Sequence, residues 1–222
     1  MKNIIALIPA RSGSKGIPFK NILQFKGKPL LAHSIIYAKK SSLIQDVIVS
    51  TDSEEFASIS NEFGARAPFI RPNDLSGDKV QDYPVVKHAV NFLEKESKNK
   101  IDYIALLRPT SPLRPPNLIE KAYQILKNNK LGTSVRSVVP VSQHSYRQWF
   151  LNGDKMISAQ DNIFEPYNLP RQRLPQFYFQ SGDIEFIKRS TLDQNTVSGD
   201  FILPLILENK DLYDIDTYED LK

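Results

Sequence analysis

The chain has 222 residues, a length that suits one α/β domain with a small insertion. Its net charge of +4 favours anionic ligands, whereas a nucleic-acid partner would require longer basic runs than the Lys/Arg pairs present here. Because there is no cysteine and only three histidines, the sequence excludes a thiol nucleophile, a disulfide framework and a thiolate metal site, and argues against a histidine metal cluster.

Short apolar runs rich in Ile and Val predict buried strands at residues 4–8, 46–51, 102–107 and 133–139. Helical spacing lies between them, at residues 29–41, 52–64, 83–96 and 115–129. The second of these helices has an N-cap candidate in Asp52 and ends at Gly64. Strands that are apolar on both faces are typical of a mainly parallel sheet with helices on both sides. We therefore predict a doubly wound α/β fold, in which ligands bind beyond the carboxyl ends of the strands.

The apolar run at the start of the chain resembles a signal peptide only superficially. It is followed by Pro9 and Arg11 rather than by a small-residue cleavage site, so we interpret it as a strand. No run approaches the roughly 20 apolar residues that are needed to cross a bilayer. We therefore expect a cytoplasmic protein with neither a membrane nor a nucleic-acid partner.

The pattern changes in the third quarter of the chain. Residues 140–180 have weak periodicity, contain the single tryptophan, and carry one hairpin signal at Asn152-Gly153. A further strand is predicted at 182–189, before the chain closes with LYDIDTYEDLK. We interpret residues 140–180 as an arm, serving as an interface or as a substrate lid, inserted in a single domain that spans residues 1–222.

The loop after the first strand, IPARSGSKGIPFKN, concentrates cations on a flexible turn. Gly13 and Gly16 allow a tight turn whose N–H groups can face an anion. Arg11, Lys15 and Lys20 would donate charge-assisted hydrogen bonds to phosphate oxygens. The loop matches neither the Walker nor the dinucleotide fingerprint, and a solvated basic loop is the alternative when it is considered alone.

Near the end of the chain, YDIDTYED places Asp214 and Asp216 two residues apart. On a strand such residues point to the same face, so their carboxylates could converge on one Mg²⁺. An acidic strand end alone is more often solvated surface. Beside a loop that binds polyphosphate, however, a divalent metal that bridges the phosphates is the expected partner, so we predict Mg²⁺ at these two residues.

Three further loops gather polar side chains that could contact a base, a ribose or a carboxylate. They hold Arg71 in FIRPNDLSGD, Arg108, Thr110, Ser111 and Arg114 in LLRPTSPLRPP, and Arg171, Arg173, Tyr178 and Gln180 in NLPRQRLPQFYFQSGD. The second of these loops follows the strand at 102–107 and therefore lies at the ligand end of the predicted sheet. Each loop taken alone is equally compatible with an ordinary connection.

Together, IPARSGSKGIPFKN, VSTDSEEFA, LLRPTSPLR, the RQ…LP segment and DIDTYEDL resemble, in order and spacing, the bacterial acylneuraminate cytidylyltransferases. These enzymes make CMP-sialic acid and related CMP-nonulosonates. The resemblance covers nearly the whole chain, and the first motif with the terminal Asp-x-Asp is its most specific part. It implies a Rossmann-like nucleotidyltransferase fold and transfer of CMP from CTP to the anomeric hydroxyl of a 2-keto-3-deoxy nonulosonic acid, with release of pyrophosphate.

The resemblance also implies residue roles. By this resemblance, the catalytic residues would be Arg11, Lys20, Asp214 and Asp216, of which Asp214 and Asp216 would bind Mg²⁺. Nucleotide contacts fall to Arg11, Ser14, Lys15, Gly16, Lys20, Asn21, Arg71 and Asp78. Sugar contacts fall to Arg108, Thr110, Ser111, Arg171, Gln172, Tyr178 and Gln180. Residues 140–180 would correspond to the family's dimerisation excursion, which lends residues to the partner's site, so a homodimer is implied.

Departures from the family pattern bear on the sugar. Arg108 replaces the usual Gln, Arg173 replaces an acidic residue, and Asp183 replaces a small residue. These changes favour a legionaminic or pseudaminic acid type of substrate over ordinary N-acetylneuraminate. Cytidylyl transfer to an eight-carbon keto acid and a non-catalytic nucleotide-binding subunit are the alternatives. Uridylyl transfer to a sugar 1-phosphate is disfavoured by the RSGSKG and DIDT motifs.

Overall fold

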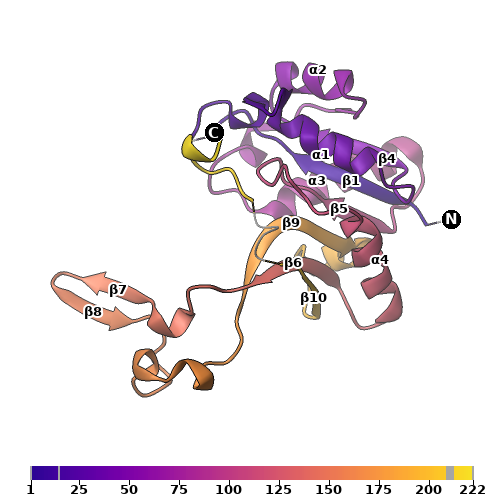
Figure 1. Cartoon of the computed structure of the whole chain (residues 1–222). Coiled ribbons are helices and arrows are strands. Elements are labelled where there is room, and N and C mark those ends of the chain that lie inside the picture. Colours follow the sequence, from indigo (N-terminus) through magenta and orange to yellow (C-terminus); the bar gives the residue numbers. More distant parts are fainter. Residues whose placement is uncertain (1, 15, 209–212, 222) are drawn as a thin grey trace.

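The computed structural model describes residues 2–14, 16–208 and 213–221 (Figure 1). Its centre is a six-stranded sheet with the order β10-β6-β9-β5-β1-β4. These strands are β1 (Ile4–Pro9), β4 (Asp46–Ser50), β5 (Tyr103–Leu106), β6 (Ser134–Pro140), β9 (Tyr178–Lys188) and β10 (Ile202–Ile206). β1 pairs in parallel with β4 and β5, and β6 pairs in parallel with β10, whereas β9 runs antiparallel between β5 and β6. The predicted mostly parallel, doubly wound fold is confirmed.

Helices cover both faces of this sheet (Figure 1). They are α1 (Leu30–Lys39), α2 (Glu54–Glu62), α3 (Asp82–Ser97) and α4 (Leu118–Asn128). The alternation along β1 divides the core, because Ile4, Ala6 and Ile8 pack with α1, α2 and α4. Ile5 and Leu7 point the other way and pack with α3. β1 thus buries both faces, which is why it reads as a continuous apolar run.

The start of α2 differs from the sequence prediction. Ser53, not Asp52, is the N-cap: its side chain accepts a hydrogen bond of 3.3 Å from the Phe56 N–H. Asp52 is instead used by the loop after β1, as described below. The helix ends at Glu62, two residues before Gly64, which adopts a positive φ of 81° as expected for a glycine that terminates a helix.

Some elements were not predicted. β10 lies at one edge of the sheet, and its apolar run has no polar alternation to mark it as a strand. β9 begins at Tyr178 rather than at residue 182, because it continues past Gly182, a positive-φ position, to pair with the end of β6. Short elements are β2 (Gln24–Phe25), β3 (Lys28–Pro29) and the 3₁₀ turns Lys20–Ile22, Asn73–Leu75, Ser145–Arg147, Pro166–Asn168, Arg171–Arg173, Arg189–Gln194 and Glu219–Leu221. None of the helices in the described ranges has the length and apolar character that a membrane span requires.

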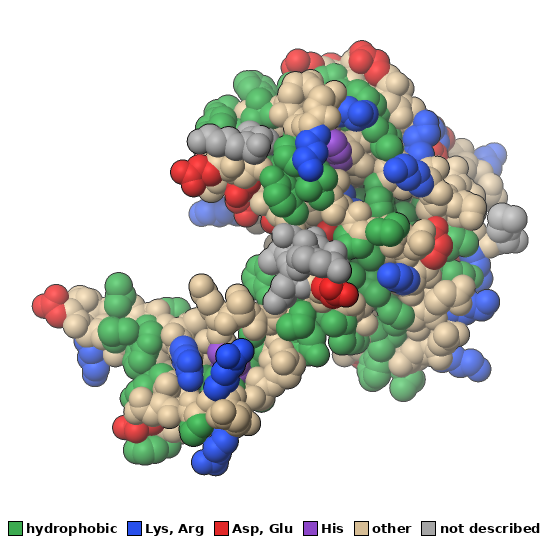
Figure 2. Space-filling view, viewed as in Figure 1, with side chains coloured by type: hydrophobic (Ala, Val, Ile, Leu, Met, Phe, Trp, Pro, Cys, Tyr) green, Lys and Arg blue, Asp and Glu red, His purple; other side chains and the backbone are tan. Residues whose placement is uncertain are grey.

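Between β6 and β9 the chain leaves the sheet and projects away from it as an arm, residues 141–177 (Figure 1). The arm carries the hairpin of β7 (Trp149–Asn152) and β8 (Lys155–Ser158), whose turn contains Gly153 with a φ of 58°, as the Asn-Gly signal predicts. Figure 2 shows the arm standing off from the domain and carrying apolar and basic side chains. Several of its large apolar side chains are exposed, including Phe150, Leu151, Met156 and Phe164.

Candidate active site

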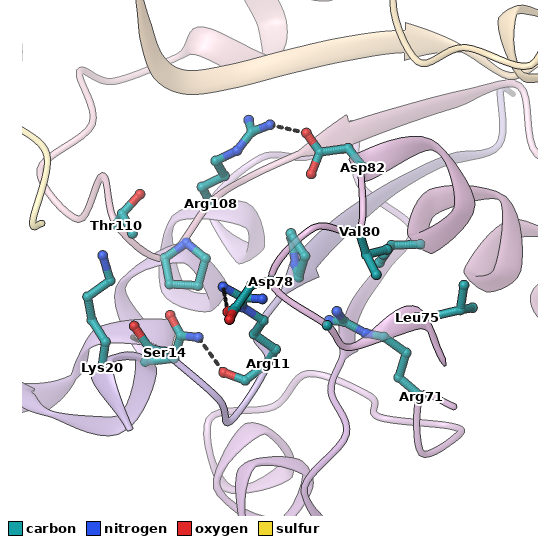
Figure 3. Close-up of a pocket in the computed structure, with 15 residues that line it drawn as sticks. Arg11, Ser14, Lys20, Arg71, Leu75, Asp78, Val80, Asp82, Arg108 and Thr110 are labelled. Atoms are coloured by element: carbon teal, nitrogen blue, oxygen red, sulfur yellow. Dashed lines mark hydrogen bonds and ion pairs between the residues drawn. The ribbon is translucent and has the colours of Figure 1, made fainter. Parts of the chain in front are cut away.

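A cavity of about 330 Å³ lies beyond the carboxyl ends of β1 and β5 (Figure 3). Its walls come from the loop after β1, the segment that leads into α3, and the loop after β5. Eight residues singled out in the sequence line it: Arg11, Ser14, Lys20, Asn21, Arg71, Asp78, Arg108 and Thr110. This is the position where a doubly wound sheet binds its ligand, because the strand ends meet there.

The loop after β1 is fixed by polar contacts to its neighbours. The backbone N–H and the hydroxyl of Ser12 donate to the two carboxylate oxygens of Asp52, at 2.7 and 3.0 Å. The Asn21 amide donates to the Arg11 carbonyl at 2.9 Å, so Asn21 shapes the loop as well as lining the cavity. Lys15, predicted to bind phosphate, lies outside the described residues. Asp52 was missed as a loop anchor, although its place directly after a strand end was a usable signal.

Arg11 and Asp78, both predicted nucleotide contacts, form an ion pair with each other across the cavity at 2.8 Å (Figure 3). Both side chains are about one-third exposed. An anionic ligand in the cavity would therefore meet an arginine that already has a carboxylate partner, and it would compete with Asp78 for the guanidinium. Such a competition favours ligands with a high negative charge, such as a triphosphate.

Arg71 is buried, with 4% of its surface exposed. Its guanidinium donates to the Ser50 hydroxyl at 3.0 Å and also contacts the Ser50 carbonyl at the end of β4. Burial lowers the pKa of Arg71 to about 10, so the side chain is still charged at neutral pH. A fixed and poorly solvated cation at the cavity wall is well suited to a polar or anionic part of a nucleotide.

The segment that holds Asp214 and Asp216 packs between the two loops of the site. Lys20 Nζ donates to the Ile215 carbonyl at 2.8 Å and lies 3.1 Å from Asp216 Oδ1. The Ile215 N–H in turn donates to the Thr110 carbonyl at 2.8 Å, and the Ile215 side chain is buried. The prediction that the two aspartates lie on a strand was wrong, because residues 213–216 form no strand. Backbone contacts, and not strand alternation, bring them to the site.

The two carboxylates repel each other. Burial raises the pKa of Asp214, and the charge of Asp216 raises it further, against the opposing effects of Thr110 and Lys20. Paired acidic oxygens of this kind fit Mg²⁺, which usually takes one or two carboxylates and completes its shell with substrate phosphates and water. In the parts of the chain that the structure describes, no group of three or more His, Asp or Glu side chains forms a metal site, so phosphate ligands would have to complete this one.

The predicted sugar contacts are divided between two places. Arg108 and Thr110 line the cavity, whereas Ser111 is 1% exposed and packs near Gly182, so a ligand in the cavity does not reach it. Arg171 lines a separate cavity of about 590 Å³ in the arm. It lies in a 3₁₀ turn of the arm with Gln172. The chain therefore does not bring Arg171 to its own strand-end cavity.

Arg108 is held on both sides by carboxylates. Its two terminal nitrogens lie 2.5 Å from Asp82 at the start of α3 and 2.5 Å from Glu185 on β9. Burial lowers the pKa of Arg108, but the two carboxylates more than offset that effect and raise it. Gln180 belongs to the same network, because its side-chain oxygen accepts a 2.5 Å hydrogen bond from Arg136, which lies 3.0 Å from Glu185. Sequence reasoning missed Asp82 and Glu185, although an acidic residue inside the apolar strand GDIEFIK was a signal.

Arg114 fixes the loop after β5 to the neighbouring elements. It is 8% exposed, and it donates to the Asp183 carbonyl at 2.6 Å and to the Ser34 hydroxyl at 2.9 Å. Burial lowers its pKa to about 10. Asp183, one of the departures from the family pattern, is 1% exposed, and burial raises its pKa. Arg114 and Asp183 therefore stabilise the loop and do not line the cavity.

A family model described as cytidylyltransferase matches residues 5–201, a range that includes the loop after β1, β5 and the Arg108 network. The chain belongs to this family. A pseudaminic acid cytidylyltransferase of Campylobacter jejuni is 33% identical to this cytidylyltransferase over 231 residues, which cover 100% of this chain and 94% of the relative. An N-acylneuraminate cytidylyltransferase of Escherichia coli is 33% identical over 99% of this chain and 50% of its own length. The predicted acylneuraminate cytidylyltransferase type and its use of CTP are thereby confirmed.

Other comparisons agree. A CMP-N,N'-diacetyllegionaminic acid synthase of Legionella pneumophila is 38% identical over 73% of this chain and 66% of the relative. Among solved structures, a CMP:2-keto-3-deoxy-manno-octonic acid synthetase complexed with CTP has a TM-score of 0.70 at 17% identity, covering 97% of this chain and 94% of that one. A 4-diphosphocytidyl-2C-methyl-D-erythritol synthase has a TM-score of 0.68 at 14% identity, covering 99% of this chain and 95% of that one. At these identities the structures support the fold alone.

Proposed function

We propose that this cytidylyltransferase transfers CMP from CTP to the anomeric hydroxyl of a nonulosonic acid of the pseudaminic or legionaminic type and releases pyrophosphate. The observation that carries the proposal is the contact between Lys20, which lines the cavity, and the segment of the two aspartates: Lys20 lies 3.1 Å from Asp216. CTP and the acid are both anions, so their approach requires fixed positive charge at the reacting phosphate. The names of the relatives supply the class of acid.

The side chains around the cavity have separable tasks. Arg11 and Lys20 would hold the triphosphate, with Lys20 near the α-phosphate, and Arg71 would contact the nucleoside side. Asp214 and Asp216 would hold Mg²⁺, which, when bound, offsets the charge of the phosphates. In the reaction the anomeric oxygen bonds to the α-phosphorus, the bond to pyrophosphate breaks, and the hydroxyl proton passes to an aspartate.

The arm has a proposed role in assembly. Its exposed apolar side chains, Phe150 and Leu151 among them, suit a contact with a second copy of the chain, so we propose a homodimer that works in the cytoplasm. The arm cavity carries Arg147, Arg171 and His144 and would accept an anion. In the dimer each arm would present Arg171, with neighbouring Gln172, to the acid bound at the partner's strand-end cavity.

The test is pyrophosphate release from CTP and Mg²⁺ with a panel of nonulosonic and octulosonic acids. We expect turnover with a pseudaminic or legionaminic type acid and much weaker turnover with N-acetylneuraminate and with the eight-carbon acid. Turnover with the octulosonic acid alone would refute the proposed substrate and identify the eight-carbon acid in its place. Silence across the panel, from folded protein that binds CTP in calorimetry, would favour a non-catalytic nucleotide-binding subunit.

A further inference from the structure

Glu185 is a charged residue in the middle of a sheet, with 1% of its surface exposed. Arg108 Nη1 lies 2.5 Å from one of its oxygens, and Arg136 Nη2 lies 3.0 Å from the other. Arg108 also contacts Asp82, so two arginines and two carboxylates form one network without net charge. Arg136 extends the network to Gln180 at 2.5 Å and to Ser198 at 2.6 Å.

The fold does not require a charge at this position. On the β6 side, the register partner of Glu185 is Arg136, the second arginine of the network. On the β5 side, Glu185 pairs with Leu106, which pairs with Leu7 on β1, which pairs with Ile48 on β4. All three of these neighbours are fully buried and apolar. A buried ion pair recovers at most the cost of removing its charges from water, and an apolar pair of similar volume would serve stability as well or better. The charge at Glu185 therefore calls for an explanation other than stability.

Arg108 connects this network to the cavity. It lines the cavity, and 25% of its side chain remains exposed. A guanidinium has five N–H groups, so the two carboxylate contacts leave three for other partners. Asp82 holds one terminal nitrogen of Arg108 (Figure 3), and Glu185, from a different element, holds the other. The planar fork therefore has a fixed orientation at the cavity wall.

The place of Arg108 in the sheet order indicates which substrate it meets. The order β9-β5-β1-β4 puts Arg11, which follows β1, and Arg71, which contacts Ser50 at the end of β4, on one side of the cavity. Arg108 follows β5 and is tied to β9, on the side from which the arm departs. If CTP occupies the β1 and β4 side, the half next to Arg108 is left for the second substrate.

We infer that Glu185 is a specificity-determining positioning residue: together with Asp82 it fixes the guanidinium of Arg108, which then binds an oxygen-rich part of the acid substrate, a carboxylate or an acyl group. This inference rests on the proposed function. The effect of Glu185 is on affinity for the acid and on discrimination between acids. CTP, bound on the other side of the cavity, is unaffected.

The experiment is a double-mutant cycle with Glu185→Gln, Arg108→Lys and the double variant, read as separate KM values for the acid and for CTP. Each single change should raise the acid KM about tenfold or more while the CTP KM stays within about twofold. The acid KM of the double variant should be no higher than that of the more impaired single variant, because both changes remove the same fixed fork. The ranking of acids in the panel should also change.

The matched control is the pair Glu94–Arg189, which joins α3 to the segment after β9 at 3.0 Å and does not line the cavity. Arg189→Lys should lower the melting temperature and leave both KM values within twofold. Glu185→Gln that only lowers the melting temperature, or that raises the KM of CTP as much as that of the acid, would overturn the inference, as would additive effects in the cycle. If Glu185→Gln does not fold, Arg108→Lys decides by the same criteria.

The failure of the proposed function gives a different result. In that case the wild-type protein turns over no acid of the panel although it binds CTP, and the inference falls with it. With the wild type active, an unchanged acid KM in both single variants refutes the positioning role alone.

Discussion

Replacing Lys20 by alanine is the most direct perturbation of the proposed chemistry. The side chain is 13% exposed, and its Nζ lies between the Ile215 carbonyl at 2.8 Å and Asp216 at 3.1 Å, so its position is fixed before substrate binds. A charge-assisted hydrogen bond is worth roughly 1.5–3 kcal/mol. If Lys20 makes one such bond to the reacting phosphate, Lys20→Ala should lower kcat/KM for CTP by a factor of roughly 10 to 150.

The assay is continuous pyrophosphate release at saturating acid, with CTP varied from below to above its KM. Lys26→Ala is the matched control, because Lys26 is an exposed lysine of the same region whose ammonium group lies over the Phe25 ring. It should retain full activity. A loss smaller than about tenfold for Lys20→Ala, which corresponds to ~1.4 kcal/mol, would refute a direct contact with the phosphate.

Three changes test other parts of the site, and a fourth tests the electrostatics. Asp216→Asn should abolish turnover with the fold intact by circular dichroism; substantial Mg²⁺-dependent activity would contradict the metal role. Asp52→Ala removes both bonds to the loop after β1, so CTP affinity in calorimetry should fall about tenfold, and unaltered affinity would show that the loop holds its shape alone. Replacing residues 141–177 by a short linker should give monomers in light scattering, and an unchanged dimer mass would exclude the arm as interface. Burial raises the pKa of Glu94, but the hydrogen bonds and charge of its partners, chiefly Arg189, outweigh burial and hold this pKa below 4.5. Glu94→Gln should therefore lower the free energy of unfolding fully at neutral pH, and the difference from the wild type should vanish as acid protonates Glu94. A difference in urea unfolding that does not change with pH would contradict the charge effect.

The sequence predicts the helices and the parallel strands because each of them buries a face with a recognisable period. β1 is an example: its alternate residues serve two different helix layers, so it reads as an uninterrupted apolar run. The direction of β9 could not be predicted, because an apolar run has the same pattern whether a strand runs parallel or antiparallel. β10 was missed for a related reason, since a short edge strand with exposed Ile202 and Ile206 lacks a clear inner face.

For the site, the sequence shows which loops lie at the ligand end of the sheet, but it does not show which side chains in those loops contact each other. Residues in the loops after β1 and β5 come together because the ends of parallel strands meet. The partners of Arg108 are 26 and 77 residues away, and nothing in its local spacing shows that both of its terminal nitrogens are engaged. The separation of Arg171 from the cavity is likewise a property of the arm's path, which weak periodicity does not encode.

The contact between Lys20 and the segment around Asp216 joins residues that are 196 positions apart. At a synthesis rate of about 5–20 residues per second, the ribosome needs roughly 10 to 40 s to make the chain between them. The loop that follows β1 therefore exists for that time without the carbonyl of Ile215 that holds its lysine. All six strands of the sheet precede residue 213, so a nascent chain can complete its sheet before the segment of Ile215 is made. The proposed site therefore depends on a segment that is synthesised after every strand of the sheet.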